Sequence, residues 1–473
     1  MTAAQQTTDG ATLAVTAAYD GSPITELDQN DVAAVTAAMA TADALFHDRG
    51  QWLALPRRIE ILRATAEIMR ARFEDLAVQA AREGGKPLID SRVEIDRAID
   101  GVEGCVEVLR SEGGEVIPMG LNASSAGRVA FTRHEPIGPV VSVSAFNHPM
   151  NLIVHQVAPA VATGCPVVVK PAADTPLSGK AFVEILHEAG LPPEWCQLIV
   201  TDRIDVAEAL VTDPRVAFFS FIGSARVGWM LRAKLAPGAR CALEHGGAAP
   251  VIVAADADLA DSIPRMVKGG FYHAGQVCVS VQRVFAHADI AESLAGEMAA
   301  QAGALRVGDP TSADTDVGPL IRPGEVTRVA EWVREATDGG ARLLCGGERI
   351  SETCYAPTVL YDPPADARVS TAEIFGPVVC VTPYTDIDAA IARANGLPYA
   401  FQSSVFTRDI DTAMRAYALL ESSAVMVNDH TAFRVDWMPF AGLRQSGLGV
   451  GGIPHTLNDM RIQKMMVLRS DEL

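Results

Sequence analysis

Four short segments contain residue types that could carry out catalysis or bind a ligand. Cys278 ends a Gly-Gln-Val-Cys segment and could act as a nucleophile, because a thiolate attacks carbonyl carbon readily. Glu244 precedes His-Gly-Gly and could act as a general base. Lys170 follows three valines, and the turn Gly223-Ser224 follows an apolar run, so both could bind phosphate or ribose. Taken singly, each also fits a structural role, such as a buried small side chain or an ordinary turn.

Composition and charge restrict the partners that we expect. The chain has 473 residues, of which 49% are hydrophobic and 21% are charged, as in folded globular proteins. Its 39 Lys and Arg residues against 58 Asp and Glu residues give a net charge of −19. Because nucleic acids and anionic lipids attract positive charge, we expect neither a nucleic-acid partner nor a membrane partner.

Cysteine spacing and early charge indicate the compartment. The eight cysteines form no C-x-x-C pair and no zinc-like spacing with histidine, so we expect neither disulfides nor a metal site. The first Lys or Arg is Arg49, whereas secretory and mitochondrial targeting segments carry early positive charge. We therefore expect a cytoplasmic protein.

Apolar runs that alternate with helical segments predict an α/β fold. Short runs at residues 140–145, 167–169, 198–200 and 217–221 are typical of buried strands. The helical period appears between them, at residues 151–162, 176–189 and 205–211. Strand-helix-strand alternation predicts a doubly wound parallel sheet, and a second series from residue 251 to about 427 predicts a second α/β half.

The flanking segments show other patterns. Residues 31–46 and 58–83 have the helical period and predict helices that cover a sheet. Residues 128–135 and 464–469 resemble exposed strands. The first 17 residues are rich in Ala, Thr and Gln without a helix cap, which predicts a loose arm.

Seven motifs occur in an order and at intervals that resemble the aldehyde dehydrogenase superfamily. They are Phe146-Asn-His-Pro149, Lys170-Pro171, Gly223-Ser224, Glu244-x-Gly-Gly, Gly-Gln-x-Cys278, Glu373-Ile-Phe-Gly-Pro377, and Pro439-Phe440 through Ser446-Gly447. The resemblance extends from about residue 20 to the C-terminus. The residues of these motifs resemble most closely those of the branch that contains lactaldehyde and phosphonoacetaldehyde dehydrogenases.

This resemblance implies two doubly wound parallel-sheet domains plus an extended β oligomerisation arm. We expect a dinucleotide-binding domain at residues 1–117 and 137–245 and a catalytic domain at residues 246–455. The arm is expected at residues 118–136 and 456–473. Because an unpaired edge strand promotes aggregation unless another subunit covers it, we expect a homodimer or a homotetramer.

The resemblance also implies the catalytic roles. Cys278 matches the nucleophile that forms a thiohemiacetal and then a thioester, and Asn147 matches the residue that stabilises the oxyanion. Glu244 matches the general base that activates the deacylating water. Relatives that transfer the acyl group to coenzyme A typically lack this glutamate, so Glu244 implies a carboxylic acid as product.

NAD or NADP is the cofactor that the resemblance implies. The matching cofactor positions are Phe146, Lys170, Ala173, Gly223, Ser224, Glu373 and Phe375. Gly223 and Ser224 match the pyrophosphate turn, whereas Glu373 and Phe375 match the nicotinamide ribose site. Ala173 stands where a glutamate that disfavours a 2′-phosphate is common, so the choice between NAD and NADP stays open.

Six residues match positions around the tunnel that leads to the nucleophile: His148, His155, Val277, Val279, Arg434 and Phe440, with Phe433 and Trp437 nearby. Two histidines and an arginine suit a hydrocarbon poorly, because an unpaired buried polar group costs about 1–3 kcal/mol. We therefore predict a small polar aldehyde, such as lactaldehyde or a semialdehyde; Val277 offers no cation for a phosphonate. In the alternative interpretation Arg434 points to solvent and His155 bonds to backbone.

Three other functions stay open at this point. They are oxidation of apolar aliphatic or aromatic aldehydes, a non-catalytic structural or binding role on this fold, and thiol-esterase activity without a cofactor. The joint presence of Cys278, Glu244 and Asn147 argues against a non-catalytic protein. The turn at Gly223 and the lysine at 170 would be superfluous in an esterase.

Overall fold

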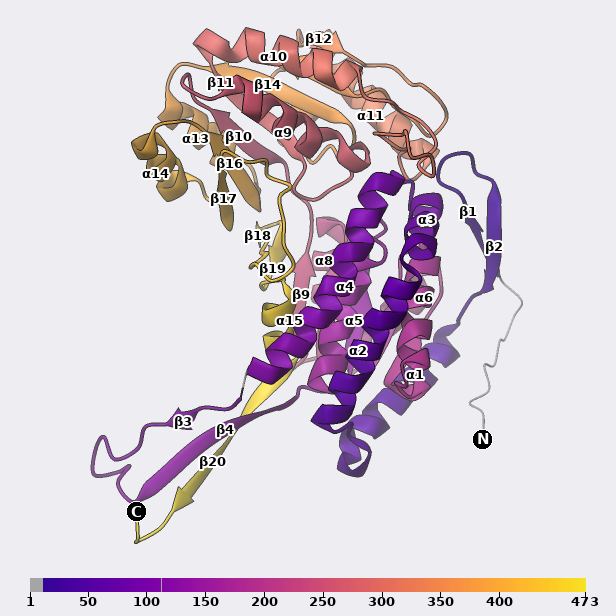
Figure 1. The fold of residues 1–473 in the computed structure, drawn as a ribbon, viewed down its shortest axis with the longest axis vertical. Coiled ribbons are helices and arrows are strands. Elements are labelled where there is room, and N and C mark those ends of the chain that lie inside the picture. The colour runs from indigo at the N-terminus through magenta and orange to yellow at the C-terminus, as the bar shows by residue number, and fades with distance from the viewer. Residues whose placement is uncertain (1–11, 112) are drawn as a thin grey trace.

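The chain folds into two α/β units and a projecting β arm. A computed structural model describes residues 12–111 and 113–473. In Figure 1 the first unit forms the lower part of the molecule, the second unit forms the upper part, and the arm extends away from the first. The predicted α/β fold with parallel sheets is confirmed.

The first unit contains a six-stranded sheet in the order β19-β9-β8-β5-β6-β7. Its strands are β5 (Val140–Val143), β6 (Val167–Lys170), β7 (Cys196–Leu198), β8 (Phe218–Ile222), β9 (Arg240–Glu244) and β19 (Gly447–Leu448). All neighbours are parallel except β19, which is antiparallel to β9. Since side chains alternate along a strand, Val140 and Val167 enter one core and Val141 and Val168 enter the core on the opposite face.

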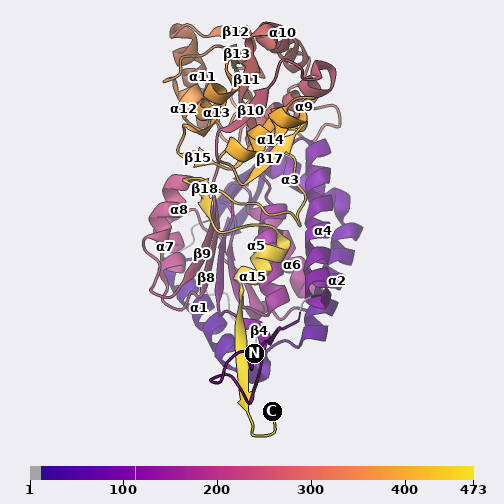
Figure 2. The same ribbon diagram turned by 90° about the vertical axis from the view of Figure 1, so that its left-hand side faces the viewer.

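Helices cover both faces of this sheet. They are α1 (Val32–His47), α2 (Leu55–Ala71), α3 (Phe73–Gly84), α4 (Leu88–Ser111), α5 (Asn151–Thr163), α6 (Pro176–Glu188), α7 (Ile204–Thr212), α8 (Ala225–Arg232) and α15 (Ile453–Asp459). Figure 2 shows α7 and α8 on one side of β8 and β9, with α2 and α4 on the other side. This arrangement buries both faces, as a parallel sheet requires.

The second unit contains a seven-stranded sheet in the order β12-β13-β14-β11-β10-β16-β17. Its strands are β10 (Ala249–Val253), β11 (Val281–His287), β12 (Arg342–Cys345), β13 (Thr358–Tyr361), β14 (Val378–Tyr384), β16 (Gln402–Phe406) and β17 (Ala424–Val427). Only the edge pair β12 and β13 is antiparallel in this sheet. The carboxyl ends of its central strands lie away from the nucleophile segment, which instead precedes β11.

Six helices and several short elements complete the second unit and its junction with the first. The helices are α9 (Leu259–Phe271), α10 (Ala288–Gly303), α11 (Pro323–Asp338), α12 (Arg368–Thr371), α13 (Ile387–Asn395) and α14 (Ile410–Leu419). Strands β15 (Tyr399–Ala400) and β18 (Leu443–Arg444) form a small ladder. The short helical turns are η1 (Arg49–Gln51), η2 (Pro193–Trp195) and η3 (Tyr272–Gly275).

The arm is an antiparallel sheet in the order β20-β4-β3. Strand β4 (Arg128–Pro136) pairs along its whole length with β20 (Arg461–Arg469), and β3 (Val116–Ile117) adds a short edge. Apolar side chains on the arm remain exposed, including Phe131, Met465 and Val467.

The structure differs from the sequence expectations in three segments. The helical pattern at 58–83 forms two helices that are separated at Arg72. Thr12–Thr16 is a strand, β1, paired with β2 (Pro23–Asp28), although a loose arm was predicted there; residues 1–11 lie outside the described residues. Finally, β19 lies within the predicted range 246–455 and α15 begins within it, but both pack on the first unit, because β19 extends its sheet and α15 contacts α4 and α5.

Within the described residues, no helix is long and apolar enough to cross a membrane.

Candidate active site

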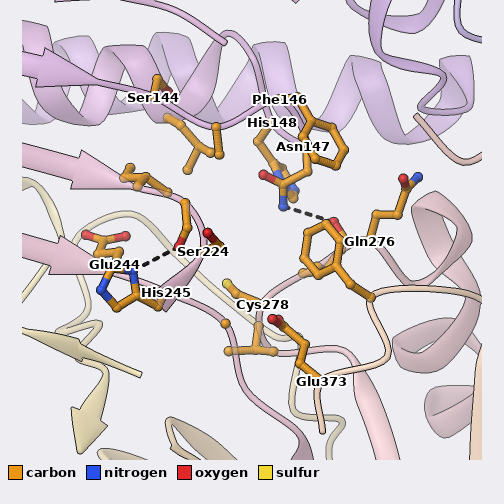
Figure 3. Close-up of a pocket in the computed structure, with 18 of the residues that line it drawn as sticks. Ser144, Phe146, Asn147, His148, Ser224, Glu244, His245, Gln276, Cys278 and Glu373 are labelled. Carbon is orange, nitrogen blue, oxygen red and sulfur yellow. Dashed lines mark hydrogen bonds between the residues drawn. The ribbon is translucent and has the colours of Figure 1, made fainter. Parts of the chain in front are cut away.

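A cavity of about 930 Å³ lies where the first sheet faces the second unit. The ends of β5, β8 and β9 contribute one wall, and the segments around Cys278 and Glu373 contribute the other. Figure 3 shows Asn147, Glu244, Cys278 and Glu373 around this space. The carboxyl edge of a parallel sheet is the usual ligand-binding edge of such folds.

A tight turn presents Cys278 to the cavity. After α9, His273 and Ala274 adopt left-handed backbone angles (φ 48° and 53°), and Gly275 follows with φ 69°. A Cβ at Gly275 would lie 2.2 Å from the Gly376 carbonyl oxygen, so only glycine fits this close approach. Burial raises the pKa of the Cys278 thiol to about 12, and the positive charge of Arg434 opposes this shift.

Asn147 faces the segment that carries the nucleophile. It follows β5, is 6% exposed, and donates from Nδ2 to the carbonyl oxygen of Gln276 at 2.9 Å, as the dashed line in Figure 3 shows. Gln276 is itself fixed, since its Nε2 donates to the Pro319 carbonyl and its Oε1 accepts from the Ile321 N–H. The Asn147 amide is therefore held against Gln276, which lies two residues before Cys278 in the chain.

Glu244 ends strand β9 and lines the cavity. Its main chain is held on both sides: its carbonyl accepts from the Gly223 N–H at 3.0 Å, and it pairs with Gly447 of β19. A Cβ at Gly451 would lie 2.2 Å from its Oε1. Burial raises the pKa of Glu244, while Arg434 and His155 favour the carboxylate. In the described part of the chain, no side-chain or backbone donor hydrogen-bonds this carboxyl, which leaves it available to water.

The predicted cofactor residues fall into two groups. Phe146, Gly223, Ser224, Glu373 and Phe375 line the central cavity. The Phe146 and Phe375 rings meet edge-on, with their centroids 5.9 Å apart. His245 Nδ1 donates to the Gly223 carbonyl at 2.9 Å and thereby fixes the turn before α8 (Figure 3).

Lys170 and Ala173 do not line the central cavity. Lys170 lies at the same sheet edge, because β6 pairs with β5 and the Lys170 carbonyl accepts from the Ser144 N–H. Ala173 lines a neighbouring cavity of about 610 Å³ together with the ion pair between Asp174 and Arg322.

All six predicted substrate residues line the central cavity, which Cys278 also lines. Val277, Val279 and Phe440 form an apolar cluster with Phe401, and Cys278 packs against it. His148 lies edge-on to the Tyr272 ring. Phe433 and Trp437 are 43% and 62% exposed and do not line the cavity.

The alternative interpretation of Arg434 and His155 is wrong. The Arg434 side chain is only 10% exposed, and its guanidinium lies 3.5 Å from the centre of the Phe440 ring. His155 bonds to the carboxylate of Asp436 at 2.6 Å rather than to backbone. Both side chains therefore belong to the polar end of the cavity.

Comparison with known proteins decides the family. The sequence profile of the aldehyde dehydrogenase family matches residues 5–466. The 3-sulfolactaldehyde dehydrogenase of Priestia aryabhattai is 36% identical over 451 residues, which cover 95% of this chain and 93% of that protein. The chain belongs to the aldehyde dehydrogenase family.

Two solved structures agree with this aldehyde dehydrogenase over nearly the whole chain. Aldehyde dehydrogenase 21 from Physcomitrella patens, in complex with the reaction product succinate, has a TM-score of 0.93 and 35% identity, covering 98% of this chain and 95% of that one. The glyceraldehyde-3-phosphate dehydrogenase of Methanocaldococcus jannaschii, complexed with NADP, has a TM-score of 0.92 and 32% identity, covering 97% and 99%. The predicted aldehyde dehydrogenase activity and NAD(P) dependence are confirmed at the level of the family.

Several cavity residues of this aldehyde dehydrogenase were missed from the sequence. Arg97, Asn151, Tyr272 and Gln276 line the cavity, and Asp436 lies directly behind it. Arg97 comes from α4, whose sequence has the pattern of an ordinary amphipathic helix. Asp436 stands between Val435 and Trp437, and a carboxylate between two apolar residues was the one available signal.

In residues 12–111 and 113–473, no group of three or more His, Cys, Asp or Glu side chains is placed to hold a metal ion.

Proposed function

We propose that this chain oxidises a small polar aldehyde to a carboxylic acid, with NAD or NADP as cofactor and Cys278 as nucleophile. The observation that carries the proposal is that Cys278, Asn147 and Glu244 line one cavity although they come from three separate segments. A nucleophile, an oxyanion donor and a base in one enclosed space are what acyl chemistry on a cysteine needs.

The first stage is addition of the thiol to the aldehyde. Because burial raises the pKa of Cys278, the thiol passes its proton to a water molecule as the sulfur attacks the carbonyl carbon. The carbonyl oxygen becomes an oxyanion, which the Asn147 amide and the Cys278 backbone N–H stabilise by donating hydrogen bonds. The Asn147 Nδ2 carries two N–H groups; one donates to the Gln276 carbonyl, and the other is available for the substrate.

The second stage releases the acid. When bound, NAD(P) supplies the hydride acceptor that allows the thiohemiacetal to become a thioester. Glu244 then takes a proton from a water molecule, which attacks the thioester carbon, and the Cys278 sulfur leaves. Burial favours this role, since a raised pKa makes the Glu244 carboxylate a stronger base.

The residues present fit a dinucleotide. The glycine at 246 leaves room for the Glu373 carboxyl, because a Cβ there would lie 1.6 Å from its Oε1. Ser224 precedes α8 without capping it, so the first N–H groups of that helix lack a side-chain cap. Gly223 and Ser224 would hold the pyrophosphate. Lys170 would hold the adenosine ribose, and Ala173 would leave space near its 2′ position. Glu373 and Phe375 would hold the nicotinamide ribose, with Phe146 beside them.

The polar end of the cavity supports a polar substrate. Arg434 lies against the Phe440 ring, and its buried Nε has no hydrogen-bond partner, so a hydrocarbon chain would leave this donor unsatisfied. Two of the similar proteins act on, or release, small oxygenated molecules: 3-sulfolactaldehyde and succinate. We therefore favour lactaldehyde-like or semialdehyde substrates over apolar aliphatic or aromatic aldehydes.

Reduced-nicotinamide absorbance with a panel of aldehydes tests this proposal. Lactaldehyde and succinate semialdehyde should give higher kcat/KM than hexanal and benzaldehyde with NAD or with NADP. A preference of about tenfold or more for the last two would contradict the polar substrate. Ester cleavage without nicotinamide reduction would indicate an esterase, and neither activity would indicate a structural or binding role.

We further propose a cytoplasmic homo-oligomer. All eight cysteines are free, which suits a reducing compartment.

The exposed apolar side chains of the arm would be covered by a second copy of the chain. Residues 1–117 and 137–245 then act as the dinucleotide-binding domain, 246–455 as the catalytic domain, and 118–136 with 456–473 as the oligomerisation arm, except that β19 and α15 pack on the first unit. A monomer in sedimentation at micromolar concentration would contradict the oligomer.

A further inference from the structure

The carboxylate of Asp436 is already fully engaged. Arg97 binds it through two hydrogen bonds, Nε to Oδ2 at 2.9 Å and Nη2 to Oδ1 at 2.7 Å. His155 Nε2 donates to Oδ1 at 2.6 Å, and Asn151 Nδ2 donates to the same oxygen at 3.3 Å. Although burial acts in the opposite direction, His155 and Arg97 hold the pKa of Asp436 well below its usual range. Asp436 is therefore an anion whose charge Arg97 compensates.

Arg434 has guanidinium donors that its neighbours do not use, although the charges of Glu244 and Asp436 act on it. Its Nε lies 3.8 Å from the occupied Oδ1 of Asp436, which is too far for a hydrogen bond. That Nε is buried and has no hydrogen-bond partner. Its Nη2 reaches only His155 Nδ1, at 3.5 Å. A buried cation with unused donors costs free energy that an anion in the cavity would recover.

The position of this cation relates it to the nucleophile. Arg434 lines the cavity and stacks on Phe440, which belongs to the apolar cluster against which Cys278 packs. Its charge acts on both Cys278 and Glu244. In the described chain, Glu244 makes no hydrogen bond to Arg434, so this carboxyl does not occupy the guanidinium donors.

We infer that Arg434, supported by the Arg97–Asp436–His155 group, is a binding site for an anionic oxyacid group at the far end of the aldehyde substrate. This inference rests on the proposed function and narrows it: the substrate is a short aldehyde that carries a carboxylate or a sulfonate, rather than a neutral hydroxyl group. A guanidinium fork matches the paired oxygens of either anion.

A matched set of aldehydes tests the site in the wild-type enzyme. We would compare kcat/KM for 4-oxobutanoate, 3-oxopropane-1-sulfonate and the neutral 4-oxobutanamide, which has the length of the first. At least one anion should exceed the amide by about tenfold or more, and the carboxylate and sulfonate arms identify which oxyacid is preferred. Equal values would overturn the anion site and leave the dehydrogenase proposal intact. No nicotinamide reduction with any aldehyde would instead overturn the proposed function.

Variants assign the effect to Arg434. Arg434→Gln should reduce the ratio of anionic to neutral kcat/KM by about tenfold, mainly through KM, and weaken succinate binding in isothermal titration calorimetry. Arg434→Lys keeps the charge without the fork and should retain an intermediate ratio. Arg265→Gln, on the exposed face of α9, is the matched control and should retain the wild-type ratio. If Arg434→Gln fails to fold, the Lys variant decides; an unchanged ratio in a folded variant would overturn the assignment.

Discussion

Lys86 and Glu94 form an ion pair whose side chains are only 2% and 1% exposed. Glu94 Oε2 accepts from Lys86, while its Oε1 accepts from the backbone N–H groups of Met150 (2.9 Å) and Asn151 (3.0 Å). One carboxylate thus ties α4 to the first turn of α5, immediately after the loop that carries Asn147. The pair therefore fixes the position of the loop that carries Asn147 relative to α4.

Removing one partner of this pair should destabilise the protein strongly. Lys86→Met leaves the Glu94 carboxylate buried without its cation, at a cost of about 3–5 kcal/mol in the free energy of unfolding. Urea denaturation measures the change. Glu60→Gln is the control, because its pair with Arg57 is exposed and contributes about 0–1 kcal/mol. A loss below about 1 kcal/mol for Lys86→Met would contradict the importance of the pair.

Replacement of Asn147 should slow the reaction without removing cofactor binding. Asn147→Ala deletes the side-chain donor to the oxyanion, so kcat should fall by about 100-fold or more. Steady-state kinetics measures this, with the KM for the cofactor as an internal comparison. Asn122→Ala, in the exposed loop of the arm, should keep the wild-type kcat. A similar loss in both variants would indicate a general effect on folding.

The reactivity of Cys278 should rise steeply with pH. A thiol reacts as the thiolate, and burial raises the pKa of Cys278 to about 12. Its alkylation by iodoacetamide should therefore accelerate about tenfold per pH unit between about pH 6 and pH 9, without levelling. Mass spectrometry of the Cys278 peptide follows the reaction, and Cys278→Ala should abolish dehydrogenase turnover. A plateau near neutral pH would show that the thiolate is already formed.

Glu244→Gln should separate the two stages of the reaction. The amide cannot take a proton from water, so acylation of Cys278 should proceed while deacylation slows. Stopped-flow absorbance should then show a burst of reduced nicotinamide, about one equivalent per site, before a slow steady state. Loss of the burst with normal cofactor binding would assign Glu244 a different role.

The sequence by itself predicted two α/β units with parallel sheets and identified the nucleophile segment. In strand β6, residues 167–169 are all valine because strands of a parallel sheet are buried on both faces, so such runs stand out in the sequence. Helix boundaries were harder: the pattern at 58–83 continues through Arg72, and packing of α3 against α4 rather than α2 decides the break there.

Only the tertiary structure decided the polar end of the cavity. Arg97 and Asp436 are 339 residues apart, and nothing near either residue in the sequence indicates the other. The same holds for Glu94 and Met150 and for Asn147 and Gln276, which are 56 and 129 residues apart. Local periodicity reports which face of an element is buried, but it does not report which charges meet across the interface. Whether Arg434 faces solvent or the cavity depends on which side chains bind Asp436. Those partners, Arg97 and His155, meet Asp436 only when the chain packs.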